Sequence, residues 1–388
     1  MKKKILAATM ALALGITSLT GCGSDSASSG NKAGTENTAG TKEDSASEAT
    51  DAEKALAAEF IDRAPTQDDV VTEAVVNETI KLLKEKYQFE DVKKILVSGD
   101  TDTYVALGKG WYDALFNDSG ISVEIQQSVD DNEPSLMERG ELTFANRMLY
   151  PYLLDKKNGA DIIAVWNSDN PPKEIITIVT KADAPYESFA DLKGKKIASS
   201  AAGCPYSALM ELADTQGWEK GVDFEHVNTK EYINALLANE VDAICYHPDW
   251  NISAVLLSDE AKIIDTAVDG GVYVSGGGDR VVFAPTQFVK DNPNVVHGYV
   301  KLMEVVSAYL VNNKEDAAKV QESIDRTPAE GTEFWIDSAV GTYYTNPRSL
   351  DELKENARSF SEWLVEKDEN FDAPLDVENG FFAEEFFE

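Results

Sequence analysis

The sequence contains little cysteine, little histidine and few positive charges. Three cysteines and three histidines occur among 388 residues, and 35 Lys and Arg residues stand against 69 Asp and Glu residues. Because the motifs Cys-x-x-Cys, His-Glu-x-x-His, Gly-x-Ser-x-Gly and the Walker glycine loop are absent, we predict no metal, no cofactor and no catalytic residues. The carboxylate excess repels phosphate groups, which excludes nucleic acid as a partner and membrane docking by charge. The charge either solvates the surface or attracts cationic ligands.

The N-terminus carries three lysines over residues 2–4 and an apolar run over residues 5–19. This run is too short for a membrane span and is followed at once by polar sequence. The stretch Leu19-Thr20-Gly21-Cys22 resembles the bacterial lipobox, in which the cysteine is lipidated and becomes the first mature residue. The alternative is an ordinary cleaved signal with an incidental cysteine. We predict a lipoprotein signal peptide over residues 1–21 and an extracytoplasmic protein held to the bacterial membrane only by lipid on Cys22.

Residues 22–50 are mostly small and polar, with no aromatic side chain. Such a segment buries too little apolar surface to offset the entropy of ordering, so we predict a disordered tether, or alternatively a tail with no role. Residues 51–388 are long enough for two lobes of ordinary size. Within them, residues 51–93 are predicted to form an N-terminal helical extension, with helices over residues 52–61 and from an N-cap at Thr66.

Residues 94–174 alternate apolar strand patterns with helical spacing. Strands are predicted over residues 94–98, 121–126, 142–145 and 162–166, and helices over residues 104–116, 133–140 and 149–157. This alternation is typical of a doubly wound sheet covered by helices. We assign these residues to lobe 1.

The alternation then restarts over residues 175–279, which we assign to lobe 2. Strands are predicted over residues 175–181, 195–199, 224–227 and 241–246, and helices over residues 188–192, 206–217 and 230–239. Strands over residues 261–265 and 280–284 are predicted to lead back to lobe 1, which the chain rejoins over about 280–388. The predicted fold is therefore α/β, with two doubly wound lobes, a hinge and an interlobe cleft beyond the carboxyl ends of the strands.

The stretch Ala190-Asp191-Leu192-Lys193-Gly194-Lys195-Lys196-Ile197-Ala198 resembles a signature of the solute-binding proteins of ABC importers. It is most similar to the branch that binds nitrate, taurine and other sulfonates, or pyrimidine precursors of thiamine. Residues 136–142, 159–165 and 236–243 resemble further elements of that branch in the same order, and Pro248 matches a proline after the second-lobe strand. The sequence departs from the family at Thr143, where aspartate is usual, and over residues 245–250.

The resemblance implies a type II periplasmic-binding-protein-like fold. It also implies a monomer that captures a small organic solute between its lobes and delivers it unchanged to ABC permease subunits. The solute is either a sulfonate-like, taurine-like or nitrate-like anion or a pyrimidine-like heteroaromatic. The alternatives are a ligand-sensing lipoprotein without transport and a secreted enzyme on the same fold.

Two loops that precede predicted helices are the first candidate ligand contacts. Free N–H groups at a helix start favour an anion, although most such turns bind nothing. Glycine permits close approach of the backbone to a ligand, and proline suits the first helical turn. The candidates in these loops are Asp100, Thr101, Asp102 and Tyr104 in lobe 1, and Gly203, Cys204 and Tyr206 in lobe 2.

Further candidates lie near the ends of predicted strands. Asn146 and Arg147 follow the third strand, and Arg147 either pairs with an anionic ligand or lies at the surface. Four aromatic residues, Trp166, Tyr206, Tyr246 and Trp250, either form an aromatic box around the ligand or pack the hinge. His247 and Asp249 either hydrogen-bond a ligand or serve only as loop residues.

Carboxylates in the candidate loops conflict with an anionic ligand. Asp100, Asp102 and Asp249 either cap helices or point inward, and in the second case a cationic or neutral heteroaromatic solute fits better. The remaining cysteines, Cys204 and Cys245, are either joined in a disulfide or remain two half-buried thiols.

Overall fold

The computed structural model forms one compact unit over Ala46–Glu388. The signal peptide predicted over residues 1–21, the lipidated Cys22 and almost all of the tether predicted over residues 22–50 lie outside the described residues. Within the described part of the chain, no helix combines the length and the apolar character that crossing a membrane requires. The described residues are 48–126, 132–169, 176–200, 204–247, 250–266, 279–337, 349–368 and 370–387.

The first group of strands forms a two-stranded sheet, β1-β2, and a three-stranded sheet of order β3-β10-β4. Its strands come from distant parts of the sequence: β1 (Lys94–Ser98), β2 (Ser122–Gln126), β3 (Ala145–Met148), β4 (Ile162–Asp169) and β10 (Arg280–Pro285). β1 pairs with β2 in parallel, and β10 pairs antiparallel with β3 and β4. A parallel bridge between Val97 and Phe144 links β1 to the segment before β3. The strand predicted over residues 280–284 therefore returns to lobe 1.

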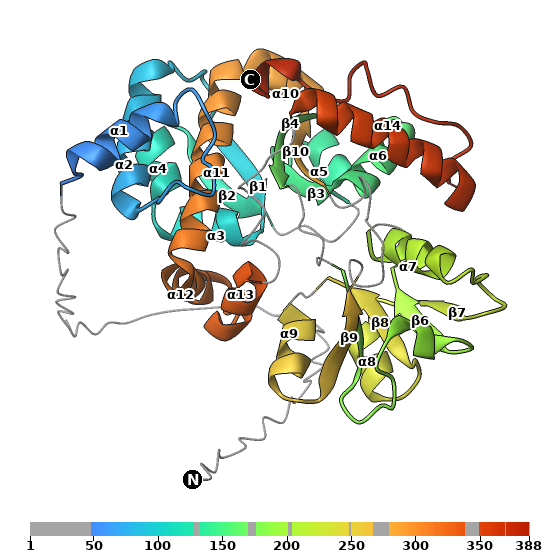
Figure 1. Cartoon of the computed structure of the whole chain (residues 1–388). Helices are drawn as coiled ribbons and strands as arrows, with labels where there is room; N and C mark the ends of the chain where they lie inside the picture. The colour runs from blue at the N-terminus through green and yellow to red at the C-terminus, as the bar shows by residue number, and fades with distance from the viewer. Residues whose placement is uncertain are drawn as a thin grey trace, which may run out of the picture. The chain divides into compact units, whose positions relative to one another are not determined.

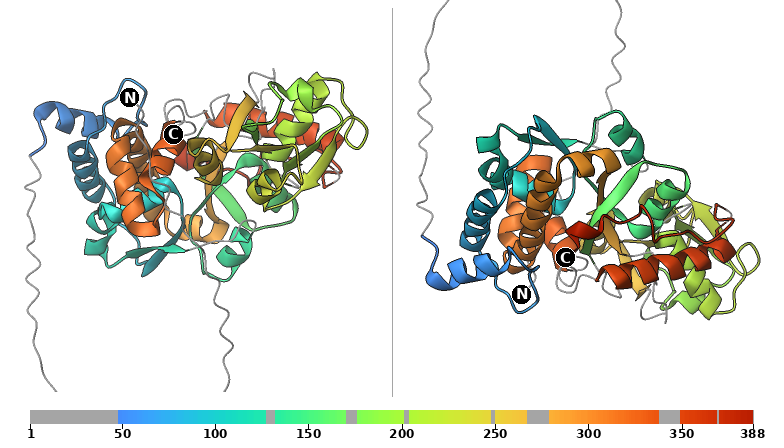
Figure 2. Two further views of the ribbon diagram at one scale, coloured as in Figure 1. Left: turned by 90° about the horizontal axis from the view of Figure 1, so that it is seen from below. Right: turned by 90° about the horizontal axis from the view of Figure 1, so that it is seen from above.

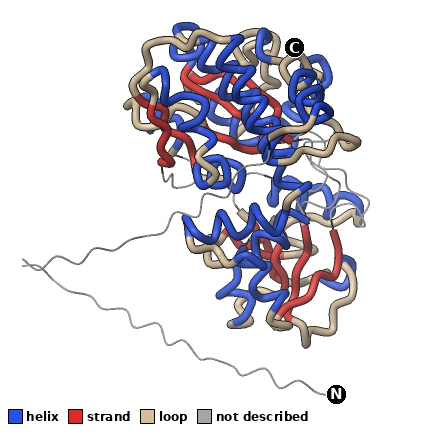
Figure 3. Tube along the Cα trace, turned by 90° about the vertical axis from the view of Figure 1, so that its left-hand side faces the viewer, coloured by secondary structure: helices blue, strands red, loops and turns tan. Residues whose placement is uncertain are grey.

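The second group of strands forms one sheet of order β7-β6-β8-β5-β9. Its strands are β5 (Thr177–Lys181), β6 (Lys196–Ser199), β7 (Glu225–Asn228), β8 (Ala243–Tyr246) and β9 (Ala261–Thr266). β6 pairs in parallel with β7 and β8, and β5 pairs antiparallel with β8 and β9. The strand predicted over residues 261–265 is β9, an edge strand of this sheet, and the next described strand, β10, pairs with β3 and β4 of lobe 1. Figure 3 shows the strands as two separate groups with helices around each.

Helices cover both groups of strands (Figures 1 and 2). Those of lobe 1 are α1 (Asp51–Glu59), α2 (Glu73–Lys86), α3 (Thr101–Gly108), α4 (Trp111–Phe116), α5 (Glu133–Glu138), α6 (Leu149–Lys157), α10 (Thr286–Asp291), α11 (Pro293–Asn312), α12 (Lys314–Asp325), α13 (Ala329–Trp335) and α14 (Leu350–Lys367). Those of lobe 2 are α7 (Cys204–Thr215), α8 (Tyr232–Leu237) and α9 (Trp250–Leu257). Helix α11 is buried along most of its length and contacts α2, α3, α12 and β4.

Two contacts join C-terminal helices to lobe 2. Helix α13 packs against α9, and an ion pair of 2.5 Å connects Lys367 of α14 to Asp214 of α7. The C-terminal helices therefore touch both lobes, although the strand nearest to them in sequence belongs to the first group.

The two lobes share one local structural motif. Helix α5 is followed by Gly140 and α8 by Asn239, and both residues have a positive φ, of 71° and 59°. Three residues after each, a side chain accepts a hydrogen bond from the neighbouring strand: Thr143 Oγ1 from Leu96 N at 3.0 Å, and Asp242 Oδ2 from Lys196 N at 3.0 Å. Thr143 therefore accepts a hydrogen bond from β1 of lobe 1, as Asp242 does from β6 of lobe 2. It does so although aspartate is the usual residue at the position of Thr143 in the family.

Three predicted elements of lobe 1 differ in the structure. No helix begins at Thr66, although its backbone N–H and hydroxyl bond Asp69 as those of Thr50 bond Glu53 at the start of α1; α2 begins later, after the N-cap Thr72. The helix predicted over residues 104–116 is divided into α3 and α4 by Gly110, whose φ of 70° a continuous helix cannot accommodate. The strand predicted over residues 142–145 is shifted and begins only at Ala145.

Candidate ligand-binding site

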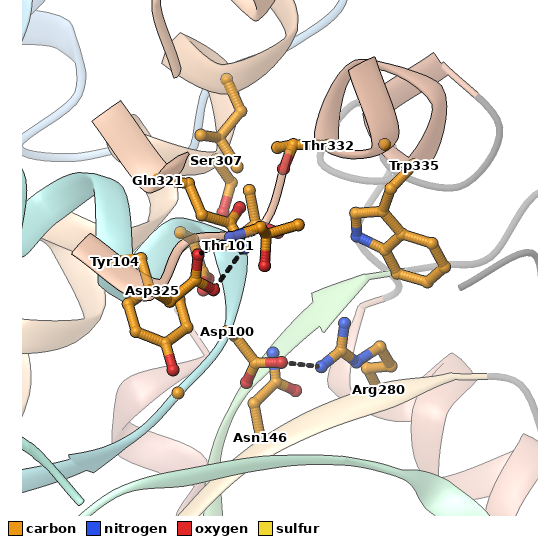
Figure 4. Close-up of a pocket in the computed structure, with 15 residues that line it drawn as sticks. Asp100, Thr101, Tyr104, Asn146, Arg280, Ser307, Gln321, Asp325, Thr332 and Trp335 are labelled. Carbon is orange, nitrogen blue, oxygen red and sulfur yellow. Dashed lines mark hydrogen bonds and ion pairs between the residues drawn. The ribbon is translucent and has the colours of Figure 1, made fainter. Parts of the chain in front are cut away.

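A cavity of about 350 Å³ lies in lobe 1, at the beginning of α3. The first turn of α3 and strands β3 and β10 line one side, and helices α11, α12 and α13 line the other. Figure 4 shows the side chains that converge there. This volume is at the small end of the range typical of pockets for organic ligands.

The first turn of α3 positions the predicted residues of lobe 1. The Thr103 hydroxyl accepts a hydrogen bond from Asp100 N at 2.8 Å and lies 2.9 Å from the carbonyl oxygen of Ser98, to which it donates. These bonds fix the loop between β1 and α3. A Cβ atom at Gly99 would lie only 2.6 Å from the Tyr104 hydroxyl, so this position needs glycine for Tyr104 to lie against the loop.

An ion pair closes the lower part of the cavity in the view of Figure 4. Arg280 Nη2 lies 3.0 Å from Asp100 Oδ1, and the two side chains are 15% and 26% exposed. Burial raises the pKa of Asp100 above its ordinary value, and the Arg280 charge only partly opposes that rise. The Asp100 side chain therefore compensates the arginine charge in the cavity wall.

Helices α12 and α13 supply polar groups on the opposite side. Asp325 accepts hydrogen bonds from Gln321 Nε2 at 3.0 Å and from Thr327 N at 2.9 Å. Gln321 is 7% exposed and Thr332 only 2%. Gln321 Oε1 and Thr332 Oγ1 have no hydrogen-bond partner among the described residues. Buried polar atoms of this kind are uncommon in folded proteins and call for a ligand or water.

The structure brings five predicted site residues together. Asp100, Thr101, Asp102, Tyr104 and Asn146 all line this cavity. The Asn146 side-chain oxygen accepts a hydrogen bond of 3.0 Å from Ser168, which orients the amide. Their contact with a ligand stays a prediction.

Two other predicted residues of lobe 1 lie outside the cavity wall. Arg147 forms ion pairs with Asp155 at 2.8 Å and Glu133 at 3.4 Å, so its charge is already matched within the protein. Trp166 is 6% exposed and belongs to the main hydrophobic core.

The predicted residues of lobe 2 that are described do not line the cavity. Cys204 is buried at the start of α7, and the Tyr206 hydroxyl accepts a hydrogen bond of 2.9 Å from Lys220 Nζ. The ring of Tyr246 stacks on Tyr232 at 3.9 Å. His247 follows β8 and is half-buried, whereas Gly203 and Asp249 lie outside the described residues.

The two lobe 2 cysteines are free thiols in the structure. Both are buried, and burial raises the pKa of each thiol well above its ordinary value. Cys245 Sγ lies 3.4 Å from the carbonyl oxygen of Pro205, to which it donates. The disulfide alternative is therefore wrong.

None of the predicted site residues lies on the α11–α13 side of the cavity, and Arg280 was not predicted either. The missed cavity residues with polar or aromatic side chains are Arg280, Ser307, Gln321, Asp325, Thr327, Thr332 and Trp335. One available signal was the spacing of Gln321 and Asp325, four residues apart on one helical face. Another was an arginine at the first position of the apolar strand β10.

Solved structures of sulfonate-binding proteins are similar to the chain. The periplasmic aliphatic sulphonate binding protein SsuA from Escherichia coli is 16% identical, with a TM-score of 0.64 over 75% of this chain and 92% of that one. A putative periplasmic sulfonate-binding protein SsuA from Methylobacillus flagellatus KT is 18% identical, with a TM-score of 0.59 over 76% and 93%. The alkanesulfonate-binding protein SsuA from Xanthomonas axonopodis pv. citri is 16% identical, with a TM-score of 0.58 over 72% and 94%. No curated protein matches the sequence significantly.

These matches show a fold of the type II periplasmic-binding-protein class, which confirms the predicted fold. Residues 100–317, more than half of the chain, match the family described as NMT1/THI5 like. The chain belongs to the NMT1/THI5-like family, and its resemblance to solute-binding proteins of ABC importers is confirmed. The prediction that it is not an enzyme fits this family.

Proposed function

We propose that the protein captures a small organic solute in the lobe 1 cavity and delivers it unchanged to an ABC permease. The observation that carries this proposal is a ligand-sized cavity of about 350 Å³ lined by polar side chains from distant parts of the chain, among them Asp100, Asn146 and Asp325. The matched fold supports binding rather than turnover.

The charges of the cavity wall favour a neutral or cationic solute over a simple anion. Asp100, Asp102 and Asp325 line the cavity, while Arg280 is its one cationic side chain among the described residues. Arg280 is already paired with Asp100. The similar solved structures include proteins named for sulfonate binding, so this chain is proposed to share their fold and to differ in its solute. A pyrimidine-like heteroaromatic remains the better of the two predicted solute classes.

We further propose that a lipid on Cys22 anchors the protein outside the cytoplasm and that the monomer meets the permease there. The lipobox resemblance and the polar segment that follows it support this arrangement. Expression with a radiolabelled or alkyne-bearing fatty acid should label the wild-type protein and leave Cys22→Ala unlabelled. Release of both proteins into the medium without label would contradict the anchor.

Solute binding is tested by the melting temperature of the purified body, without its signal and tether. A panel should contain taurine, methanesulfonate, nitrate, benzylamine, pyrimidine and aminopyrimidines, each at a concentration far above a plausible Kd. A bound solute must raise the melting temperature, because it stabilises only the native state. Calorimetric titration of each positive solute then gives its affinity, and analysis of the recovered solute shows whether it was altered. The absence of a shift with every solute would overturn the proposed binding function.

A further inference from the structure

The N-terminal extension, residues 51–93, packs along helix α11 and precedes the family match, which begins at residue 100. At the start of α11, the Glu90 carboxylate accepts hydrogen bonds from Asn294 N at 3.0 Å and from Val295 N at 2.9 Å. The extension therefore satisfies two of the backbone N–H groups that a helix start leaves without an intrahelical partner.

The extension also holds the opposite end of α11, which is the end next to the cavity. Asn312 Oδ1 accepts a hydrogen bond from Val71 N at 2.6 Å. Asn313 Nδ2 donates one to the Val71 carbonyl oxygen at 2.8 Å. Both asparagines lie at the corner where α11 ends and α12 begins. The cavity residues Leu310 and Gln321 lie on either side of this corner in sequence.

An ion-pair cluster holds the same corner from a second direction. Lys109, directly after α3, places its Nζ atom 2.8 Å from Glu73 Oε2 of α2 and 2.7 Å from Asp316 Oδ2 of α12. The hydroxyl of Tyr309 in α11 donates to Asp316 at 2.5 Å. Helices α2, α11 and α12 and the end of α3 therefore meet at one point, and the extension contributes α2 to it.

The position of α12 decides the shape of the cavity. Gln321 and Asp325 of α12 form part of one wall, and the first turn of α3 forms part of the facing wall. Helix α12 packs directly against α3, where Gly108 leaves no room for a side chain, because a Cβ atom there would collide with Val320 and Ile324. A shift of α12 relative to α3 therefore changes the distance between the two walls.

We propose that the N-terminal extension is a positioning element of the solute cavity, and that its bonds to Asn312 and Asn313 set the affinity for the solute. Figure 1 shows α2 and α3 beside α11, with α12 at the end of α11. Without these bonds α12 is less ordered, so solute binding must include the cost of ordering one cavity wall. This inference rests on the proposed solute-binding function and gives a segment outside the family match a part in it.

Replacing each asparagine by aspartate tests the proposal, because the two side chains use opposite ends of the amide. Asn312→Asp keeps the acceptor and should bind the panel solute with the largest melting shift within about twofold of the wild type. Asn313→Asp loses the donor and places a carboxylate against the Val71 carbonyl oxygen. It should weaken binding of that solute by about tenfold in calorimetric titration.

Glu90→Ala is the matched control for a general loss of stability. It removes two hydrogen bonds between the extension and the start of α11, at the end away from the cavity. It should lower the melting temperature by about 2–4 °C, as Asn313→Asp should. Its solute affinity should stay within about twofold of the wild type, since the α11–α12 corner is unchanged.

Hydrogen exchange of the solute-free protein gives a readout that needs no solute. In Asn313→Asp, the amide groups of α12 and α13 should exchange about tenfold faster than in the wild type, and those of α14 should not change. In Glu90→Ala, faster exchange should be confined to the beginning of α11.

Contrary results separate this inference from the proposed function. Wild-type affinity or unchanged α12 exchange in Asn313→Asp would overturn the positioning role and leave solute capture intact. An equal loss of affinity in Glu90→Ala or in Asn312→Asp would also overturn it, because lost stability or added charge would then explain the effect. If no panel solute raises the melting temperature, the proposed function is wrong, and hydrogen exchange alone decides the positioning role.

Discussion

Helices α3 and α7 begin at corresponding places in the two lobes, directly after β1 and β6, yet their first turns lie in opposite surroundings. Asp100, Thr101 and Asp102 open onto the cavity, whereas Cys204, Pro205 and Tyr206 are buried in the core. Each helix region also contains a half-buried carboxylate: Asp100 pairs with Arg280, while Glu211 of α7 has Asp214 as its neighbouring charge. The same strand-loop-helix pattern thus serves ligand access in one lobe and packing in the other.

The largest expected effect is on the free energy of unfolding, and it comes from Glu211, the uncompensated carboxylate of α7. Burial, together with repulsion from Asp214, raises the pKa of Glu211 from 4.5 to about 8 in the folded protein. The folded state therefore holds this proton more tightly, so its contribution to stability is complete below pH 4.5 and is lost as pH rises through about 8. The loss should reach on the order of 3 kcal/mol.

Urea unfolding at pH 5, 6.5 and 8 measures this loss directly. Glu211→Gln should flatten the pH dependence, and at pH 8 it should have a larger free energy of unfolding than the wild type. Parallel pH curves for the two proteins would show that Glu211 stays ionised in the fold, and the contrast with Asp100 would disappear.

Removing the compensating charge of Asp100 should have the next largest effect. Arg280→Met leaves a mostly buried carboxylate unpaired and should lower the free energy of unfolding by about 2–3 kcal/mol at pH 7. Arg358, which pairs with Glu355 and Glu378, is 38% exposed and provides the surface control. Arg358→Met should cost less than about 1 kcal/mol. The double variant Asp100→Asn with Arg280→Met should recover part of the loss, and equal losses for both single arginine variants would contradict the prediction.

Replacing an aromatic residue should change the solute affinity in lobe 1 but not in lobe 2. Trp335→Leu should weaken binding of the panel solute with the largest melting shift by about tenfold, equivalent to about 1.4 kcal/mol, because it removes a flat wall of the cavity. Tyr246→Leu breaks the stacking on Tyr232 and should lower the melting temperature without changing that affinity. Calorimetric titration of both variants decides the matter, and a loss of affinity only in Tyr246→Leu would move the site to lobe 2.

Alkylation of Cys204 should give the smallest signal. Its thiol is buried and its pKa is raised, so iodoacetamide at pH 8 should leave the native protein essentially unmodified and label it fully after denaturation. Intact-mass measurement counts the added groups. Rapid native labelling that solute suppresses would show an open ligand loop at α7, as the sequence analysis predicted.

The repeating organisation of the two lobes was predictable because it depends on local pattern. Apolar periodicity predicted helix α6 with its observed bounds, and Gly140 and Asn239 mark helix ends in left-handed conformation. The helix start predicted at Thr66 is wrong even though the local bonds of a helix start are present: its N–H and hydroxyl bond Asp69, as those of Thr50 bond Glu53, but only a turn follows.

The cavity was only half predictable, because its two sides are far apart in sequence. Polar residues after β1 and at β3 indicated Asp100 and Asn146. Arg280, however, meets Asp100 from 180 positions away through the antiparallel pairing of β10. The contributions of Gln321 and Thr332 depend on how α12 packs against α3 and α13 against α12, and the spacing of apolar residues along one chain does not encode that arrangement.

Helix α13 links the binding of a solute in the lobe 1 cavity to the contact between the two lobes. This helix presents Thr332 and Trp335 to the cavity and packs against α9 of lobe 2 on another side. An occupant that displaces α13 must therefore carry α9 with it or separate the two helices. Under the proposed function, a permease that touches lobe 2 would then distinguish loaded from empty protein without contacting the solute.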